Sequence, residues 1–503
     1  MSPSSSEVDE SKKWPPMWLS FLSLILAWGS TFNFGFTMLI TNPAQEAFVK
    51  FVRASNEQNE GYGFGLAVDT QWFVILAILF IGHIIGSLLL PIIARHGRKN
   101  SFMFAVLMEV LALLATIASF WMVNHLLFTI ARILLGMGTA MAMGLSGITV
   151  LESSPTYCRG VASMVNGIFL QFALVVGAVL AMPIVLGNDA NLVYLFVFQL
   201  CCNLIVLCIV PFLHDSPQFL AHSKEGDHEK TERKVIASIM FYHGITEEQA
   251  EPLAKILMEN KQGAKAGVFT VFNDPFNRRG VGLGVLTTWG MAMSGITVIN
   301  AFTLEILMTM GLDQGTAAIA NSGTCLFSLA GIITSTFIVD LWDRRSLLLR
   351  TFSALIVINI VIVILLSFAG YKGSFLFRKL KTVYSNFQNI FVSGLLIVAI
   401  CLFNFVFSMG PGPLSMFIGG EIVTPDSRSA AAVYSNATMA TSRFVTLLTY
   451  HSVAKWCSPA AYGIYFIPSM VITVYLLHKH LPESRGRNVA DLKAEFEMEK
   501  LIE

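Results

Sequence analysis

Three ionisable side chains interrupt long apolar stretches of the sequence: His83, Glu109 and Arg443. A charge inside such a stretch is costly, so each group is a candidate for binding a ligand or moving a proton. An anionic or acidic group of a ligand would satisfy Arg443, and His83 could change its charge in the physiological pH range. A carboxylate elsewhere in the fold is the alternative partner for Arg443. For Glu109 we favour a structural pair or hydrogen bond with a neighbouring helix.

The composition indicates which class of protein holds these groups. Of 503 residues only 13% are charged, whereas soluble proteins carry about 25%. Hydrophobic residues make up 54%, and the mean hydropathy is +0.66. These values exclude a disordered chain, a nucleic-acid-binding protein and an ordinary cytosolic enzyme. A net charge of +1 argues against a polyanionic partner. The sequence therefore predicts a protein with many membrane spans.

Metal and cofactor sites leave no signature in the chain. The seven cysteines lie mostly in apolar stretches, without metal-ligand spacing or a paired framework, so we interpret them as buried small hydrophobic residues. A phosphate-binding P-loop motif is also missing from the sequence. We expect no metal, no cofactor, no nucleotide and no catalysis.

Twelve stretches of about 20 apolar residues predict twelve transmembrane helices, and therefore an all-α membrane protein. They begin near Trp18, Gln71, Ser101, Leu126, Val161, Leu192, Val281, Gly315, Leu347, Ile390, Arg428 and Ala460.

A long charged segment divides these spans six and six, which is the pattern of two parallel repeats. We expect five parts: an N-terminal tail (1–17), a first six-helix bundle (18–213), a linker (214–279), a second six-helix bundle (280–480) and a C-terminal tail (481–503). Within the linker, residues 245–262 have the pattern of an amphipathic helix.

Lysine and arginine in the short loops predict cytosolic termini. The loops that would then be cytosolic contain 95–99, 158–160, 343–345, Arg428 and 484–487, which are basic. The loop at 370–386 disagrees, because it carries four basic residues and would lie outside.

Loop and helix motifs along nearly the whole chain resemble those of the sugar porters of the major facilitator superfamily, and among them the animal facilitative hexose transporters. The residues that carry this resemblance are GSTFNFGFTMLITNP (29–43), HGRK (96–99), Arg132, ESSPTYCRG (152–160), HDSPQFL (214–220), MSGI (293–296), VDLWDRR (339–345), GPGPLSMF (410–417), Glu421, Arg428 and LPESRGR (481–487). The resemblance implies the major facilitator fold, with a substrate site near the midplane between the two bundles.

Acidic and basic residues recur at the predicted cytosolic ends of both halves. Paired across the two bundles, they would hold the inner side shut while the outer side is open. Each exposed pair contributes only about 0–1 kcal/mol, but several together could bias a two-state equilibrium. The predicted inner-gate residues are Arg98, Glu152, Arg159, Asp340, Arg344, Arg345, Glu421, Arg428 and Glu483.

Gly410, Pro411, Gly412 and Pro413 lie within the tenth predicted span. Proline removes a backbone donor and disfavours helix in the residue before it, so we expect a bend or hinge there. A passive kink is the alternative.

The pocket residues depart from the family pattern. Met291 and Ala292 replace a glutamine pair, Thr297 replaces an asparagine, and Gly167 replaces a glutamine whose role could pass to Gln171 one turn later. By the family fold, spans 2 and 11 are neighbours, so His83 and Arg443 could face one cleft. The predicted substrate-binding residues are Asn33, Gln171, Ser294, Thr297, Asn300, Ser328, Asn436 and Arg443.

The resemblance implies a facilitative carrier, by alternating access, of a hexose or related small polar solute in the lipid bilayer. We expect the protein to be an integral protein of the plasma membrane. Proton-coupled sugar porters carry an aspartate in the first helix where this chain has Thr37, so we expect uniport. A non-conducting sugar sensor and an organic-anion carrier remain the alternatives, the second because of Arg443.

Overall fold

The structure is a computed structural model that describes residues 14–59, 65–155, 157–221, 228–259, 269–309, 312–338, 342–368, 386–424, 427–457, 459–483 and 489–502. Nearly all of these residues lie in helices. The segments that correspond to the twelve predicted spans are α1, η1 and α2 (Met17–Ala27, Trp28–Phe32 and Asn33–Leu39), α4 (Val68–Ile93), α5 (Arg98–Trp121), α6 (His125–Ser153), α7 (Arg159–Leu180), α8 (Leu192–Ile209), α12 and α13 (Pro275–Ala292 and Ile296–Thr309), α14 (Gln314–Ile338), α15 (Arg344–Phe368), α16 and α17 (Asn386–Met409 and Pro411–Glu421), α18 (Arg428–Cys457) and α19 (Pro459–His480).

Eleven of these segments are long and apolar enough to cross a membrane, judged by length and composition. The remaining one, α18, has 30 residues, enough to span a bilayer, but carries more polar side chains. The all-α prediction with twelve helices is therefore confirmed, and α18 is the helix whose polarity needs a functional explanation.

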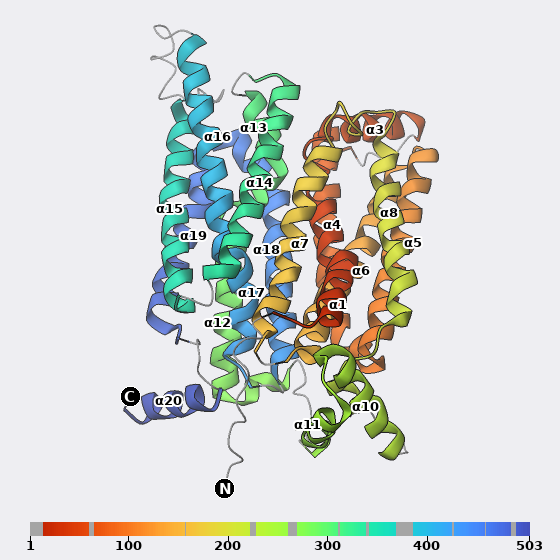
Figure 1. The fold of residues 1–503 in the computed structure, drawn as a ribbon. Helices are drawn as coiled ribbons and strands as arrows, with labels where there is room; N and C mark the ends of the chain where they lie inside the picture. The colour runs from red at the N-terminus through yellow and green to blue at the C-terminus, as the bar shows by residue number, and fades with distance from the viewer. Residues whose placement is uncertain are drawn as a thin grey trace.

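The helices form two bundles that stand side by side (Figure 1). In the first bundle α6 packs against α4 and α5, and α5 packs against α8; in the second, α16 packs against α14 and α15, and α15 against α19. The most extensive contacts between the bundles are those of α4 with α18 and of α7 with α14, and α2 also contacts α13 and α7 contacts α17. These helices therefore border the space between the bundles.

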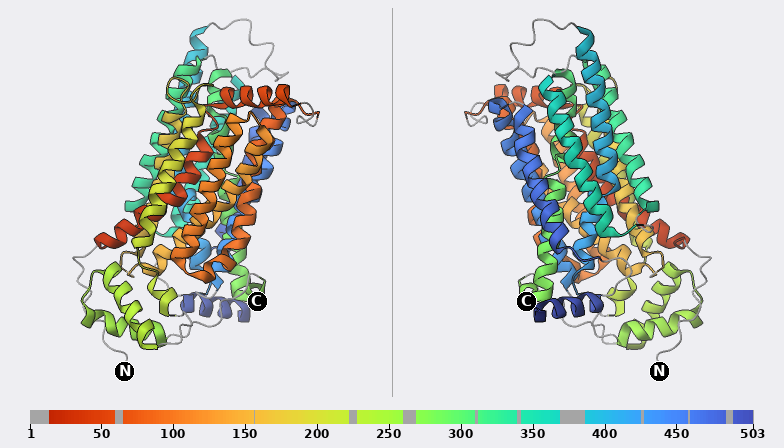
Figure 2. Two further views of the ribbon diagram at one scale, coloured as in Figure 1. Left: turned by 90° about the vertical axis from the view of Figure 1, so that its right-hand side faces the viewer. Right: turned by 90° about the vertical axis from the view of Figure 1, so that its left-hand side faces the viewer.

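Short helices lie at the two ends of the bundles (Figures 1 and 2). At one end lie α10 (His228–His243), α11 (Glu247–Glu259) and α20 (Val489–Ile502), with α9 (Pro217–Ala221) and the turn η4 (Thr270–Asn273) nearby in sequence; α3 (Gln45–Gln58) lies at the other end. We call the first end the linker end. The amphipathic segment expected at 245–262 forms α11, which buries Ala250 and Ala254 against α10.

The second bundle begins earlier than the sequence suggests. Helix α12 starts at Pro275, whereas we assigned residues up to 279 to the linker. Asp274 caps this helix by accepting a hydrogen bond from the Phe276 backbone N–H at 3.1 Å, and proline is favoured at the first helical position. This local capping signal, rather than hydrophobicity, sets the boundary.

Three spans are irregular. The first contains the π-helical turn η1, and such turns often mark functional sites. The seventh breaks between α12 and α13, where Gly295 has a φ of 102°. The tenth divides at Gly410, where a β-carbon would clash with the Thr351 hydroxyl, and continues from Pro411. The bend expected at residues 410–413 lies at this division; its role as a hinge stays a prediction.

Candidate functional site

At the linker end of the first bundle, Arg98 and Glu152 form a bidentate ion pair. The Nε and Nη2 atoms of Arg98 donate to the two carboxylate oxygens at 2.9 and 2.7 Å, and the Ser216 hydroxyl donates to the same carboxylate at 2.5 Å. Asp215 accepts from the backbone N–H groups of Arg98 and Lys99 at 2.9 and 3.2 Å, which caps α5. The motifs at 96–99, 152–160 and 214–220 therefore form one cluster.

The second bundle repeats this arrangement. Arg344 forms an ion pair with Glu421, and Glu483 accepts from the backbone N–H groups of Arg344 and Arg345 at 3.2 and 3.1 Å. Glu483 thus caps α15 as Asp215 caps α5. In each half an arginine pairs with a glutamate, and a second acid caps the helix that begins with the arginine. This repetition supports two parallel repeats.

The gate residues pair differently from our expectation. We expected acid–base pairs between the bundles, but the ion pairs described at this end lie within one bundle each. Between the bundles, Arg159 and Arg428 lie close enough to repel each other. The reason is topological: the acids and bases of one repeat meet at the ends of its own helices. Asp340 lies outside the described residues, as does most of the basic loop at 370–386.

Asn33 points away from the space between the bundles. It is fully buried, and its amide Nδ2 donates to Glu109 Oε2 at 2.8 Å and contacts Asn203 Oδ1. Asn203 Nδ2 donates to the same carboxylate oxygen at 3.0 Å. These contacts correct the substrate-binding prediction for Asn33, because its polar atoms serve a network inside the first bundle. They also give Glu109 the helix-facing hydrogen bonds that we favoured.

Ser294 likewise has a structural partner. Its hydroxyl donates to the Met291 carbonyl at 2.8 Å at the break between α12 and α13. Asn359 Nδ2 donates to the Ser294 carbonyl at 2.9 Å, and the Tyr462 hydroxyl donates to Asn359 Oδ1 at 2.9 Å. Neither Asn359 nor Tyr462 was among the residues predicted from the sequence. The sequence marks them only as an amide and a hydroxyl side chain that interrupt apolar spans.

Gln171 lies at the contact between α7 and α14. On one side of it Gly167 approaches Ile332, and on the other Leu174 shares an apolar cluster with Cys325. These two contacts show that α7 and α14 run antiparallel. In this register Gln171, between Gly167 and Leu174, lies opposite the region of Ser328, between Cys325 and Ile332. Gln171 is 5% exposed, and its Oε1 atom has no hydrogen-bond partner among the described residues.

The remaining pocket residues lie on the broken seventh span and on α18. The hydroxyl of Thr297 is buried, without a hydrogen-bond partner in the described part of the chain. The Asn300 carbonyl accepts from Asn42 Nδ2 at 2.9 Å, which links α13 to the end of the first span. Asn436 is partly buried on α18. Of the predicted substrate-binding residues, Gln171 and Ser328 therefore lie on facing stretches of α7 and α14. The hydroxyl of Thr297 has no hydrogen-bond partner among the described residues.

Arg443 reaches from α18 toward the first bundle. Its guanidinium lies over the rings of Phe34 and Phe80, at 5.5 and 5.9 Å from their centroids, and is close enough to His83 to repel a charge there. His83 Nε2 lies 3.0 Å from the Thr139 hydroxyl. Phe34, Phe80, His83, Thr139 and Arg443 therefore lie together beside the contact between α4 and α18.

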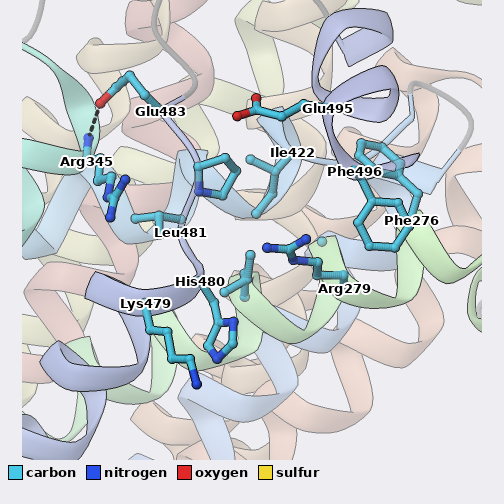
Figure 3. Close-up of a pocket in the computed structure, with 13 residues that line it drawn as sticks. Phe276, Arg279, Arg345, Ile422, Lys479, His480, Leu481, Glu483, Glu495 and Phe496 are labelled. Atoms are coloured by element: carbon cyan, nitrogen blue, oxygen red, sulfur yellow. Dashed lines mark hydrogen bonds between the residues drawn. The ribbon is translucent and has the colours of Figure 1, made fainter. Parts of the chain in front are cut away.

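Two cavities are described, and both lie away from the predicted substrate residues. One, of about 210 Å³, lies at the linker end between α12, the end of α19 and α20 (Figure 3). Arg279 and Glu495 face it, and Phe276 packs near Phe496, with ring centroids 5.9 Å apart. The other, of about 580 Å³, lies between α3 and α13 at the opposite end. Groups of metal-ligating side chains are missing from the described residues.

Comparison with known proteins gives consistent results. A model of the family described as "Sugar (and other) transporter" matches residues 22–496. Facilitated glucose transporter member 3 of Oryctolagus cuniculus is 23% identical over 486 residues, which cover 95% of this chain and 92% of that protein. Member 1 of Gallus gallus is 23% identical over 431 residues, 85% of this chain and 83% of that protein.

Solved structures share the fold. The proton:xylose symporter XylE bound to 6-bromo-6-deoxy-D-glucose superposes with a TM-score of 0.72 at 18% identity, covering 96% of this chain and 99% of that one. The human organic anion transporter MFSD10 gives a TM-score of 0.56 at 14% identity, covering 92% of this chain and 100% of that one. The xylose symporter is a protein of the major facilitator superfamily, and this chain shares its fold.

Proposed function

Because the chain belongs to the sugar (and other) transporter family, within the major facilitator superfamily, we propose that it carries a hexose or a related small polar solute by facilitative uniport. It is an integral membrane transporter and not an enzyme. The proposed mechanism is alternating access, in which the two bundles rock about a site between them.

The observation that carries this proposal is a pair of unpaired polar atoms, one on a helix of each bundle. Gln171 on α7 and Thr297 on α13 each present a buried polar atom without a hydrogen-bond partner among the described residues. A buried polar group is normally paired, so an orphaned one marks a place where a ligand hydroxyl can bind. Sugars supply hydroxyl groups that both donate and accept.

Uniport is supported by the first span. Thr37 accepts a hydrogen bond from Gln199 Nε2 at 2.9 Å, and a threonine hydroxyl cannot change its charge in the physiological pH range. The segment from Trp18 to Ile40 contains no ionisable side chain. The carrier should therefore follow the gradient of its solute.

Counterflow of labelled hexoses in proteoliposomes tests the proposal. We expect exchange with an unlabelled solute on the opposite side, at a rate that an imposed pH gradient leaves unchanged. Accumulation above the external level that a protonophore abolishes would contradict uniport. Binding without exchange would instead identify the sensor alternative.

We further propose a location in the plasma membrane with both termini cytosolic, so that the linker end faces the cytosol. The gate residues would then act through two intrabundle clusters, one around Glu152 and one around Glu421. Cysteine probes on α10 and α3, labelled from either side of intact cells, test this orientation.

A further inference from the structure

Arg443 is a buried cation whose described surroundings supply no anion. Its side chain is 9% exposed, and its Nε atom has no hydrogen-bond partner among the described residues. Ion pairs between Arg443 and a carboxylate are likewise missing from the described part of the chain, where its guanidinium lies over the rings of Phe34 and Phe80, and His83 packs against Phe34. A buried charge without an opposite charge is strongly unfavourable, so a functional reason must retain it.

The position of Arg443 is that of a substrate contact. It is the sixteenth of 30 residues in α18, and His83 is the sixteenth of 26 in α4, so both lie near the middle of their spans. These two helices form one of the most extensive contacts between the bundles. A ligand held there would contact both halves of the molecule, as alternating access requires.

His83 adds an acceptor beside this cation. The Thr139 hydroxyl lies 2.9 Å from the Leu135 carbonyl and 3.2 Å from the Gly136 carbonyl, so its single proton is directed to its own helix. It must then accept from His83, which assigns the imidazole proton to Nε2. The Nδ1 atom of the neutral ring is left as an acceptor.

The two groups together select a ligand by its chemistry. A guanidinium donates in a planar fork that matches a carboxylate, and the Nδ1 atom accepts from a hydroxyl group. Phe34 and Phe80 supply apolar faces beside the guanidinium. We propose that this site binds a sugar that bears a carboxylate, such as a hexuronate, with the carboxylate on Arg443 and a hydroxyl on His83. This inference rests on the proposed transport function and narrows its substrate class.

The first experiment needs no mutation. The purified full-length protein in detergent is titrated with D-glucuronate, with the uncharged methyl ester of D-glucuronate and with D-glucose, and its thermal unfolding is followed. We expect D-glucuronate to stabilise at concentrations at least about tenfold lower than the other two, the scale of a charge-assisted hydrogen bond. Equal midpoints for the acid and its ester would overturn the proposal.

Variants then assign the effect to Arg443. Arg443→Gln should remove the preference for D-glucuronate over the ester, and Arg443→Lys should retain part of it, because lysine keeps the charge but lacks the fork. Ser442→Ala is the matched control, since that hydroxyl donates to Thr438 of its own helix at 2.7 Å. An unchanged preference in Arg443→Gln would overturn the proposal.

Counterflow distinguishes the carboxylate site at Arg443 from the proposed transport function on which it rests. Exchange of D-glucose without any preference for D-glucuronate would refute the carboxylate site and leave the carrier intact. Binding of D-glucuronate that depends on Arg443, without exchange of any sugar, would refute the carrier and leave the site intact.

Discussion

At the scale of single residues, the donors of the predicted pocket residues fall into two groups. Asn33 and Ser294 were as plausible from the sequence as Gln171 and Thr297. In the structure Asn33 Nδ2 and the Ser294 hydroxyl donate to groups within the protein, whereas Gln171 Oε1 and the Thr297 hydroxyl have no hydrogen-bond partner among the described residues. The difference depends on which way each side chain points across a helix interface, which polarity alone does not reveal.

Replacing Gln171 with alanine should raise the apparent KM for the solute by about two- to tenfold, the value of an uncharged hydrogen bond. Thr297→Ala should act in the same direction. Uptake kinetics at matched surface expression measure the effect. Ser163→Ala is the control on the same helix, because that hydroxyl donates to the Arg159 carbonyl at 2.9 Å. Unchanged kinetics in both pocket variants would show that the site lies elsewhere.

Replacing Glu109 with glutamine should leave the protein as stable as the parent. One carboxylate oxygen of Glu109 accepts from Asn33 and Asn203, and a glutamine carbonyl can do the same. The second carboxylate oxygen has no hydrogen-bond partner among the described residues, so its replacement by the glutamine NH2 group removes no hydrogen bond described there. Glu109→Leu should instead cost about 1–3 kcal/mol, because the two asparagine amides lose their acceptor. Thermal unfolding compares the variants; equal losses in both would show that the network needs the charge of the carboxylate.

At the scale of elements, the broken seventh span is held by its neighbours. Gly295 occupies a backbone conformation that other residues rarely adopt, and Tyr462 closes over the position of its missing β-carbon. Asn359 connects that tyrosine to the carbonyl of the residue before the glycine. The break is therefore built by three helices.

Gly295→Ala should destabilise the protein by about 1–3 kcal/mol through backbone strain, with a further loss from the contact with Tyr462. Thermal unfolding and surface expression report the effect. Gly147→Ala on α6 is the matched control, since a β-carbon there meets open space. If both variants unfold at the same temperature as the parent, the backbone at Gly295 accommodates a side chain without strain.

The docking of linker helix α10 should weaken in mild acid. Burial lowers the pKa of His214, and the charge of Lys99 lowers it further. Burial also lowers the pKa of His243, against a backbone hydrogen bond that raises it. In the folded state the pKa values of His214 and His243 both lie below the unfolded value near 6.5. The two neutral histidines therefore stabilise the docked state fully above pH 6.5, and this stabilisation is lost as the pH falls through their folded-state pKa values.

The stacking of Trp18 on Phe241, with centroids 4.8 Å apart, provides the measurement. Protection of the α10 amides from hydrogen exchange, and the fluorescence of Trp18, should change between about pH 7 and pH 5. A variant with His214→Gln and His243→Gln should lose most of this dependence. The same pH response in that variant would exclude the histidines as its cause.

The elements themselves were largely predictable, because each span had to be apolar over about 20 residues. The start of α14 at Gln314 lies one residue from the predicted Gly315, and α8 starts at Leu192 as predicted. Helix α20 was missed, because polar tail residues carry no such constraint; it is anchored by Phe496 against Phe276. The partners of Asn359 and Glu109 could not be predicted, since they come from helices distant in sequence.

At the scale of the whole molecule, the charges at the linker end bear on which side is open. The clusters of Glu152 and Glu421 stabilise their own bundles, while Arg159 and Arg428 repel each other across the boundary. The repulsion between Arg159 and Arg428 therefore weakly opposes closure of the two bundles at the linker end.

Arg428→Ala should shift the molecule toward closure of the linker end. The side chain is exposed, so the effect should be below about 1 kcal/mol, or at most about fivefold in the population of the two states. Labelling of cysteine probes placed at the linker end should slow accordingly. Arg233→Ala is the control, because its described partner Glu229 lies on the same linker helix. Faster labelling in Arg428→Ala would mean that Arg428 helps to close this end.

The repetition of the capped ion pair in each half has a consequence for how the chain can be divided. Each half contains its own arginine, its own acceptor carboxylate and its own capping acid, from Arg98 to Ser216 in one and from Arg344 to Glu483 in the other. A gene cut after Glu259 would leave both sets whole, so two polypeptides translated separately should each insert and then associate through α4 with α18 and α7 with α14. Co-expressed fragments carrying different affinity tags should co-purify, while a cut between Arg98 and Glu152 should yield fragments that are degraded.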